Sequence, residues 1–428
     1  MNELTTVAPP PELSPPATVR GRFTGEMRAF RGLMIRGAFL QVLTLGIYRF
    51  WLITDVRRFF WANTEIGGDS PEYTGTAIEL LLGFLIAIAL LVPIFVLIAL
   101  ASLGLGPIGQ ISGVVGYVVL AAFAQYAYFR ARRYRLTRTV FRGVRMHQSG
   151  SAGRYVVRSI LWGLLILFTL GLAYPYAQAS LERYKVSNTY YGNLQGSFVG
   201  SGSSLLLRGF LMWLLTIGPL VASVAIAIAL IDWDSIIAAL QGGAGRDLPR
   251  ILESNSAFQA AMGVVGGGMG WVAFFGLVLY PAFQAMVLKW WLRGLRFGPV
   301  AVSTRLRTGQ VYGVYFRYFG WTLLFILIAI LVITAAAFAA VGVIRGLGVD
   351  TATGTTLAAI GGVIGYLAFA FCIWVIYYVV VRLRMWRITV DSVDLTGFEA
   401  VEQVRADESR PSSAVGEGLV DALGAGGI

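Results

Sequence analysis

A chain of 428 residues in which 57% are hydrophobic and 13% are charged is far more apolar than a soluble domain, where about a quarter of the residues carry a charge. The formal net charge of +12 does not indicate nucleic-acid binding, because the basic residues flank apolar runs instead of forming one continuous patch. A single histidine, His147, and a single cysteine, Cys372, exclude a metal site built from several histidines and an intramolecular disulfide.

The chain begins with a Pro-rich segment and continues through long apolar runs. Residues 1–19 contain five prolines and no apolar stretch, so we expect a disordered tail rather than a signal peptide or a helix. Several later runs exceed the roughly 18 apolar residues that are typical of a transmembrane helix. The apolar segments number eight: residues 33–53, 77–103, 107–129, 155–178, 205–231, 263–291, 319–344 and 357–381.

An internal repeat appears at an offset of 125 residues. The sequence Thr-Leu-Gly at residues 44–46 recurs at 169–171, and Asn-Thr at 63–64 recurs at 188–189. In both copies a long apolar segment follows. A fainter third copy begins at Tyr280-Pro281, which resembles Tyr174-Pro175. We therefore divide the chain into a tail, two membrane repeats, a third hairpin unit and a C-terminal tail, at residues 1–19, 20–129, 130–291, 292–402 and 403–428.

The distribution of basic residues argues against eight simple crossings. With eight crossings and the N-terminus inside, nine arginines between residues 130 and 158 would lie outside, although cytoplasmic loops normally carry the excess of Lys and Arg. If both Thr-Leu-Gly segments are re-entrant or interfacial, six crossings remain. All of the 34 basic residues except Arg246, Arg250 and Arg345 then lie inside. We expect three transmembrane hairpins with both termini cytoplasmic; eight crossings is the alternative, because residues 155–178 are long enough to span.

The predicted fold is an all-α polytopic membrane protein. Each repeat combines a re-entrant or short helix with a transmembrane helical hairpin. Apolar and polar residues alternate over short stretches such as 139–145, 298–306 and 386–391, which predicts small β-hairpins at the cytoplasmic surface. The arginines of these hairpins would lie beside anionic lipid headgroups, each contributing about 1 kcal/mol.

Ionisable groups near membrane depth are the first candidates for a functional site, since their burial is costly. Glu79 begins the second apolar segment, and we predict that it pairs with Arg208, which stands at the head of the matching helix in the second repeat. A partly buried carboxylate there could bind and release a proton, as a transporter coupling site requires. The alternative is an ion pair at headgroup level that holds two helix ends together.

Three amides are further candidates. Gln125, Gln178 and Gln284 stand near the inner ends of comparable segments, each within about two turns of Lys or Arg. Such amides could line a solute path, or they could bond across helices in a structural role.

Two prolines that follow tyrosines complete the candidate site. Tyr174-Pro175 and Tyr280-Pro281 break the helical hydrogen-bond ladder, and paired breaks in corresponding repeats are typical of transporter sites. Plain kinks have the same sequence signature, so both interpretations stay open.

Enzymatic motifs are absent from the sequence. No Gly-Lys-Ser/Thr of a P-loop, no Gly-x-Ser-x-Gly elbow and no His-Glu-x-x-His occurs. The Gly-rich run at residues 266–270 lies inside an apolar segment without a preceding strand, so we interpret it as close helix packing. We expect no enzymatic activity, no metal and no cofactor.

Several short blocks together resemble a known family. They are Phe-Thr-Gly at 23–25, both Thr-Leu-Gly blocks, Ala-Asn-Thr at 62–64, Phe-Arg-Gly at 141–143, Asn-Thr-Tyr-Tyr-Gly at 188–192 and the stretch 416–423. From about Arg20 to its end, the chain is similar to the YjgN-like family of bacterial inner-membrane proteins, a domain of unknown function. It departs from similar proteins at residues 48–51, where Tyr-Arg-Phe-Trp replaces the proline and tryptophan that tend to follow the glycine. The resemblance implies a multi-pass inner-membrane protein and supplies no substrate and no catalytic residue.

The leading functional hypothesis is transport of a small solute or a lipid, because the sequence combines repeats with broken helices. The alternative is a non-catalytic membrane scaffold whose arginine-rich inner layer binds anionic lipid or a cytoplasmic partner. The expected partners are the lipid bilayer and anionic headgroups at the cytoplasmic face, with no nucleic acid. The oligomeric state stays open.

Overall fold

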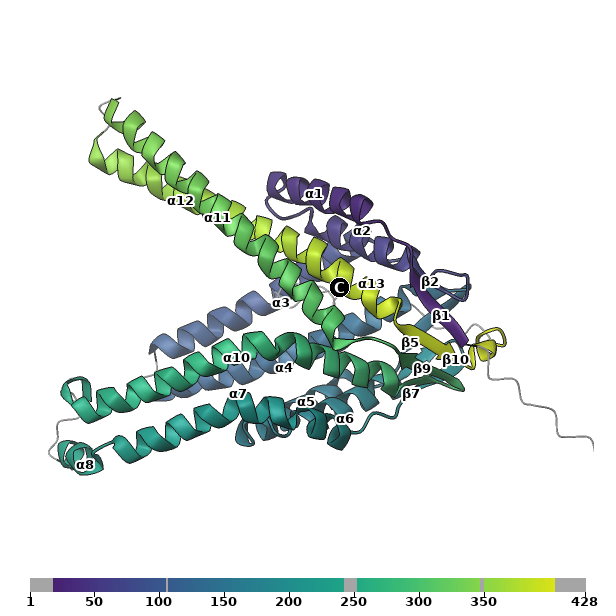
Figure 1. Cartoon of the computed structure of the whole chain (residues 1–428), viewed down its shortest axis with the longest axis horizontal. Coiled ribbons are helices and arrows are strands. Elements are labelled where there is room, and N and C mark those ends of the chain that lie inside the picture. The colour runs from purple at the N-terminus through teal and green to yellow at the C-terminus, as the bar shows by residue number, and fades with distance from the viewer. Residues whose placement is uncertain (1–17, 105–106, 242–251, 347–349, 405–428) are drawn as a thin grey trace, which may run out of the picture.

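The computed structural model describes residues 18–104, 107–241, 252–346 and 350–404, which alternate between pairs of helices and short strands (Figure 1). The strands are β1 Thr18–Phe23, β2 Thr64–Ile66, β3 Glu72–Tyr73, β4 Thr139–Phe141, β5 Val144–Gln148, β6 Thr189–Tyr191, β7 Leu194–Phe198, β8 Leu295–Phe297, β9 Val300–Thr304 and β10 Val393–Thr396. The helices are α1 Met27–Leu43, α2 Arg49–Ala62, α3 Ala77–Gly104, α4 Pro107–Thr137, α5 Ala152–Phe168, α6 Tyr174–Ser187, α7 Gly202–Leu230, α8 Trp233–Gln241, α10 Ser256–Gly294, α11 Thr308–Gly346, α12 Thr351–Tyr377 and α13 Leu383–Val390. A π-helical turn, Tyr378–Arg382, joins α12 to α13, and a short 3₁₀ helix, Phe398–Val401, follows β10.

The prediction of an all-α fold is wrong. In the described part of the chain, ten strands form one antiparallel sheet with the order β2-β1-β10-β9-β8-β7-β6-β5-β4-β3. Separate hairpins would leave their outer backbone groups unpaired, and the sheet satisfies these groups by joining each hairpin to the next. For example, Met146 of β5 lies opposite Tyr191 of β6, and Val19 of β1 lies opposite Leu395 of β10. The first and last strands therefore meet, and both ends of the described chain lie at the same sheet.

Three pairs of long helices, α3–α4, α7–α10 and α11–α12, extend from one side of this sheet (Figure 1). Within the described residues, six helices are long and apolar enough to cross a membrane; the most apolar of them, Ala77–Ala101, has a mean hydropathy of 3.1. Few side chains in these helices are buried, since the buried share of their apolar windows is between 0% and 22%. An apolar surface of this length is unfavourable in water and favourable in hydrocarbon, so the architecture is that of a membrane protein.

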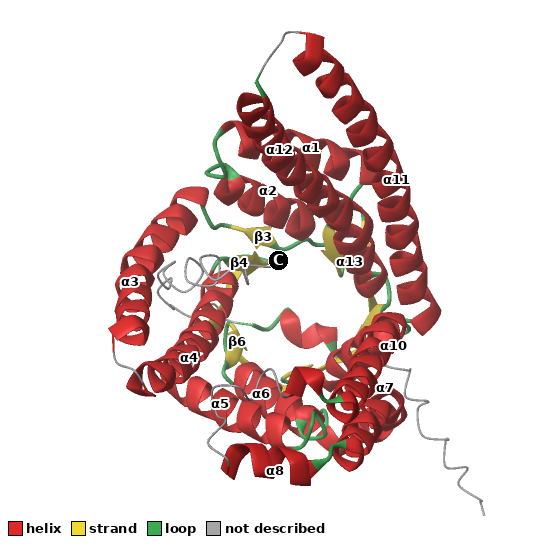
Figure 2. Cartoon of the chain, turned by 90° about the vertical axis from the view of Figure 1, so that its left-hand side faces the viewer, coloured by secondary structure: helices red, strands yellow, loops and turns green. Residues whose placement is uncertain are grey.

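Two shorter helix pairs, α1–α2 and α5–α6, begin and end at the same sheet. Their helices have 17 and 14 residues in each pair, or about 25 and 21 Å at 1.5 Å per residue. A hydrocarbon core is about 30 Å thick, so each of these helices is shorter than the core. These lengths favour six crossings over eight. Figure 2 shows the helices arranged around the arc of strands.

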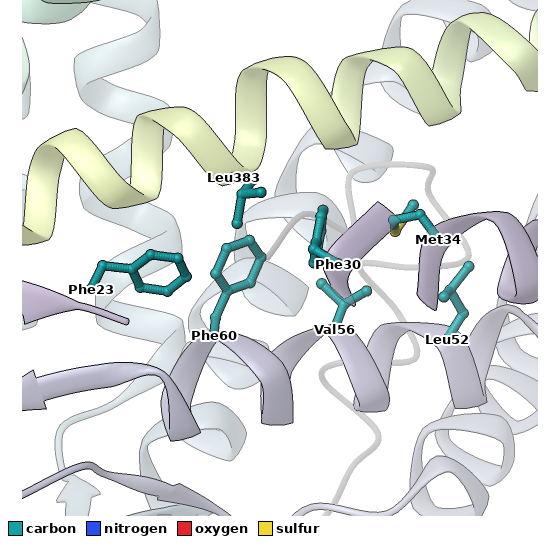
Figure 3. Close-up of a cluster of buried hydrophobic side chains, with 7 residues drawn as sticks. All are labelled: Phe23, Phe30, Met34, Leu52, Val56, Phe60 and Leu383. Atoms are coloured by element: carbon teal, nitrogen blue, oxygen red, sulfur yellow. The ribbon is translucent and has the colours of Figure 1, made fainter. Parts of the chain in front are cut away.

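The first helix pair packs against the last helix of the chain. Phe30 of α1, Phe60 of α2 and Leu383 of α13 are almost completely buried in one cluster (Figure 3). The ring centroids of Phe30 and Phe60 lie 5.3 Å apart, a favourable distance for aromatic pairs. This cluster and the β1–β10 pairing join the two ends of the fold.

Close packing of α7 and α10 depends on one glycine of the run at residues 266–270. A Cβ atom at Gly268 would collide with the side chain of Ser223 in α7, whereas Gly266 and Gly270 have no neighbouring atoms within 4 Å. The predicted packing role of the run therefore belongs to its central residue.

We expect Gly268→Leu to reduce the free energy of unfolding by about 1–3 kcal/mol, because overpacking pushes α7 and α10 apart. Thermal denaturation in detergent measures this loss. Gly270→Leu, two residues away and exposed, is the matched control and should unfold close to wild type. Equal melting temperatures for both variants would contradict the assignment.

Several sequence predictions fall outside the described residues. The C-terminal tail predicted at 403–428 lies beyond them except for its first two residues, and the N-terminal tail predicted at 1–19 does so except for Thr18 and Val19, which begin β1. Arg246 and Arg250, which were expected on the outer side, also fall outside them.

Candidate functional site

The turn between α5 and α6 has a backbone that few sequences tolerate. Leu170 and Gly171 adopt φ values of 49° and 94°, and the left-handed region is costly for leucine. Thr169 supports the turn, because its hydroxyl donates to the carbonyl oxygen of Leu165 at 2.7 Å and accepts from the amide of Ala173 at 3.0 Å. Residues 44–46, between α1 and α2, have the same pattern of φ values and threonine hydrogen bonds.

This turn is attached to α7. The indole nitrogen of Trp213 donates to the carbonyl oxygen of Leu170 at 2.8 Å. A carbonyl in a tight turn lacks a helical partner, so the indole satisfies a group that would otherwise be unpaired in lipid. The tip of the α5–α6 pair is therefore held against a long helix.

A cavity of about 380 Å³ lies between this turn, α7 and α10. Tyr174, Pro175 and Tyr280, three of the predicted site residues, line it together. The other lining residues are almost all apolar: Ile166, Leu170, Gly171, Leu172, Leu205, Leu206, Gly209, Met212, Trp213, Thr216, Ile217, Gly276, Leu279, Phe283 and Met286. Its volume is in the usual range for a ligand site.

A second cavity, of about 260 Å³, adjoins the first and shares Tyr280 and Phe283 with it. Gln284 lines this second cavity, and its amide oxygen accepts a hydrogen bond of 2.5 Å from the hydroxyl of Tyr315 in α11. The rings of Tyr280 and Tyr315 meet edge to face at 5.6 Å. Gln284 thus bonds across helices, as the structural alternative proposed.

The prolines inside α10 and α7 have different surroundings. Pro281 is a buried residue inside α10 and directly follows Tyr280. Pro219 in α7 frees the carbonyl oxygen of Leu215, four residues earlier, and the indole nitrogen of Trp271 in α10 donates to that oxygen at 2.8 Å. This carbonyl oxygen already accepts a hydrogen bond from α10, so it is not available to a ligand.

Glu79 has a different partner from the one predicted. Its carboxylate accepts from Arg138, which directly follows α4, at 2.5 Å and from the Tyr134 hydroxyl at 2.6 Å. The backbone amide of Glu79 donates to the Thr76 hydroxyl at 3.3 Å in a helix cap. Arg208 lies exposed on α7. The arrangement ties the start of α3 to the end of α4, which favours the structural alternative.

The two remaining amides lie apart from these cavities. Gln125 is half-buried on α4 and Gln178 is half-buried on α6, and neither belongs to the lining of the two cavities described above. The structure therefore brings together Tyr174, Pro175, Tyr280 and Gln284 and leaves the other candidates elsewhere.

A buried group of charges near the sheet was missed from sequence. The ammonium group of Lys185 lies 2.6 Å from the carboxylate of Glu182, with the two side chains 7% and 12% exposed. The Trp291 indole donates to the other oxygen of Glu182 at 3.0 Å. Burial alone would lower the pKa of Lys185, but Glu182 and nearby tyrosines raise it overall.

Arg132 of α4 belongs to the same group. Its guanidinium donates to the hydroxyl of Thr189 at 2.9 Å, to the side-chain oxygen of Gln148 at 3.1 Å and to the backbone oxygen of Lys185 at 3.3 Å. The i, i+3 spacing of Glu182 and Lys185 was the available signal, although on most helices it marks a solvated pair. The group joins α4, α6, β5, β6 and, through Trp291, α10.

Among the described residues, no three His, Cys, Asp or Glu side chains are grouped closely enough to hold a metal ion. The two cavities offer phenols, an amide and apolar surfaces. Such a set of groups can hold an apolar molecule and orient one polar end.

Comparison with known proteins identifies a family but does not identify an activity. A family model described as "Bacterial protein of unknown function (DUF898)" matches residues 18–422, and this match confirms the family resemblance of the sequence blocks. No curated protein and no solved structure matches the chain.

Proposed function

Because the chain belongs to DUF898, a family of bacterial proteins of unknown function, we propose a function from its main cavity: the protein binds an acyl chain of a membrane lipid between α5–α6 and α7–α10, and moves that lipid within the bacterial inner membrane. The observation that carries this proposal is the cavity of about 380 Å³, whose lining is almost wholly apolar. An acyl chain is the apolar molecule that a bilayer supplies in excess.

The depth of the cavity supports a lipid ligand. Along α10 its lining runs from Met286 to Gly276, which is about 12 to 27 Å from the helix end at Gly294. The lining thus extends along α10 for about 15 Å, which is half the thickness of a 30 Å hydrocarbon core. Leu170 and Tyr280 are 56% and 49% exposed, so the cavity reaches the outside of the helix bundle.

The polar groups in the lining favour a lipid over a polar solute. The hydroxyl of Thr216 already donates to the carbonyl oxygen of Met212 at 2.8 Å, and the Trp213 indole already donates to Leu170. A polar solute that entered the cavity would lose its hydrogen bonds to water and gain few hydrogen bonds to the lining, which is unfavourable. The lining contains no carboxylate, amine, thiol or imidazole, so we propose binding and movement of a ligand and no catalysis.

We place the sheet on the cytoplasmic side. Exposed arginines gather at the sheet and at the helix ends beside it, among them Arg20, Arg22, Arg142, Arg183, Arg293, Arg305 and Arg307. Because cytoplasmic segments carry an excess of basic residues, this placement puts both ends of the described chain in the cytoplasm.

A cavity-filling variant tests the proposal. A Cβ at Gly276 would meet no atom within 4 Å, so the indole of Gly276→Trp can occupy the cavity without displacing the backbone. Lipids with a photoactivatable group in the acyl chain should crosslink to α6, α7 and α10 in wild type. We expect Gly276→Trp to lose crosslinking about tenfold or more, and to lose leaflet-to-leaflet movement of a fluorescent lipid in proteoliposomes.

Gly270→Trp is the matched control, because Gly270 lies on the same helix, also has open space and does not line the cavity. It should crosslink and move lipid as wild type does. Crosslinks distributed evenly over the long helices, with no loss in Gly276→Trp, would refute the acyl-chain site. Crosslinking at the site without lipid movement would refute transport and leave a lipid-binding role.

The second candidate function is a non-catalytic scaffold, and the exposed arginines near the sheet favour it. Each would contribute about 1 kcal/mol beside anionic headgroups. A scaffold predicts salt-dependent association of the sheet end with anionic vesicles and no effect of Gly276→Trp.

A further inference from the structure

The α1–α2 pair contains a charged cavity of about 530 Å³. Glu26, Arg28 and Arg36 from the α1 side and Asp55 from α2 are its charged lining residues. In the described part of the chain, none of these four side chains forms an ion pair or a side-chain hydrogen bond with another residue. Two guanidinium groups and two carboxylates therefore face the same space without neutralising one another at contact distance.

The charges are particular to this helix pair. At the offset of 125 residues, the positions of Glu26, Arg28, Arg36 and Asp55 are occupied in the α5–α6 region by Ser151, Gly153, Leu161 and Ser180. The two pairs share the same turn, yet one encloses a charged cavity and the other borders an apolar one. Because both pairs have the same backbone turn, the turn does not explain why only the α1–α2 cavity is lined by charges.

The position of the cavity along α1 places it at headgroup depth. Arg28, Arg31 and Arg36 are exposed in the first ten residues of the helix, whereas residues 37–43 contain no charge. The tip beyond them carries exposed Phe39, Val42, Leu43, Leu45 and Ile47, with Leu45 94% exposed. An exposed apolar tip is favourable in hydrocarbon, so the charged part of the pair lies in the interfacial layer.

The walls of the cavity are rigid. Leu52 lines the cavity and also belongs to the buried cluster of Figure 3. A Cβ at Gly37, another lining residue, would collide with the Leu52 side chain, which shows how closely α1 and α2 approach. The cavity is thus a fixed seam between two helices that pack on α13.

We propose that this cavity binds the headgroup of a zwitterionic phospholipid, one that carries both a phosphate and an ammonium group. The four charged side chains sum to zero, which matches a headgroup of zero net charge. An anionic headgroup would pair with the guanidinium groups but face two uncompensated carboxylates.

The order of charges along the helices fits the order of groups in such a lipid. Arg36 lies about 14 Å from the start of α1, whereas Asp55 lies about 10 Å from the end of α2, and Glu26 precedes α1 at the sheet. The phosphate of a phospholipid is nearer the acyl chains than its ammonium group. Arg36 therefore receives the phosphate through its planar donor fork, and Asp55 and Glu26, which lie nearer the sheet, receive the ammonium.

This site is separate from the acyl-chain cavity, because the two share no residue. A phospholipid headgroup and a free zwitterionic phosphodiester such as glycerophosphoethanolamine have the same charged groups. We assign the lipid because the exposed apolar tip lies beside the cavity.

The test measures ligand binding to the full chain in detergent by native mass spectrometry. The probes are short-chain phosphatidylethanolamine, short-chain phosphatidylglycerol and free glycerophosphoethanolamine. We expect phosphatidylethanolamine to bind about tenfold more tightly than either of the others. Arg36→Gln should weaken its binding about tenfold, and Asp55→Asn should reduce or reverse the preference over phosphatidylglycerol.

Gly32→Trp tests the cavity itself, because Gly32 lines it and a Cβ there would meet no atom within 4 Å. This variant should lose phosphatidylethanolamine binding about tenfold or more. Gly163→Trp, on α5 with the same open space, is the matched control and should bind as wild type does. A melting temperature measured for each variant identifies loss of fold.

Three results would overturn the assignment. Equal binding of phosphatidylethanolamine and phosphatidylglycerol would show that charge balance does not select the ligand. Wild-type binding by a folded Gly32→Trp variant would show that the cavity is not the site. Free glycerophosphoethanolamine binding as tightly as the lipid would show that the ligand is a soluble zwitterion.

Discussion

Replacing Glu182 with alanine is expected to reduce the free energy of unfolding by about 3–5 kcal/mol, because it leaves the buried ammonium group of Lys185 without its counterion. The two groups are 2.6 Å apart, with their side chains 7% and 12% exposed, so solvent cannot replace the lost partner. The Trp291 indole also loses its acceptor. Unfolding of the purified chain in mixed micelles with increasing denaturing detergent measures the loss.

A double variant distinguishes the contribution of the ion pair to stability from the contribution of side-chain packing. Glu182→Gln with Lys185→Met removes both charges and keeps similar volumes, and such replacements are often neutral. We expect the double variant to be more stable than Glu182→Ala by most of the lost free energy. If the double variant is as unstable as the single one, the stabilising contribution comes from packing and not from the ion pair.

The pH dependence of this contribution follows from the raised pKa of Lys185. A lysine whose folded-state pKa exceeds its unfolded value stabilises the fold fully below the unfolded value, which is ordinarily 10.5, and the contribution is lost as the pH rises through the folded pKa. The free energy of unfolding of wild type relative to the double variant should therefore be constant near neutral pH and should fall only in strongly alkaline buffer.

Replacing Phe60 with alanine is expected to cost about 3–5 kcal/mol, since it opens a cavity in the cluster that joins α1 and α2 to α13. Phe60 is 1% exposed and packs against Phe30, Leu383 and Trp386. Because Trp386 also donates to the hydroxyl of Thr64 at 2.9 Å, loss of the ring weakens the connection between the two ends of the chain. Hydrogen exchange should increase at the β1 amides as well as in α2.

Phe39→Ala is the control for Phe60→Ala. Phe39 lies on the outward face of α1 and is 68% exposed, so its removal creates no internal cavity. The free energy of unfolding of the Phe39→Ala variant in detergent should stay within about 0.5 kcal/mol of the wild-type value. Equal destabilisation by the two variants would show that the cluster does not determine the stability of this region.

The candidate site shows where residue-by-residue reasoning succeeds. Tyr174, Pro175 and Tyr280 were selected because a proline after a tyrosine predicts a helix break, and the structure places them around one cavity. Pro175 stands in the first turn of α6 and Pro281 lies inside the continuous helix α10, so neither proline breaks a helix, although the missing amide of each is a local property that the sequence reveals directly. The helix that packs beside each proline is decided by the tertiary structure, and the local sequence does not contain this information.

The pairing of Glu79 shows where such reasoning fails. Matching the two repeats placed Arg208 opposite Glu79, but Arg138 is the side chain that reaches the carboxylate. Arg138 directly follows the helix that returns beside α3, so the pair depends on how one hairpin folds back on itself. An alignment of repeats compares equivalent positions and does not identify spatial neighbours.

The sequence by itself determined the long apolar helices and the family, because runs of apolar residues and local turn blocks are properties of consecutive residues. It left six and eight crossings open. Only the tertiary structure decided that the short strands form one sheet, that β1 meets β10, and that Glu182, Lys185 and Arg132 are buried together. Backbone hydrogen bonds between strands and the desolvation of charges depend on distant segments, which local patterns do not specify.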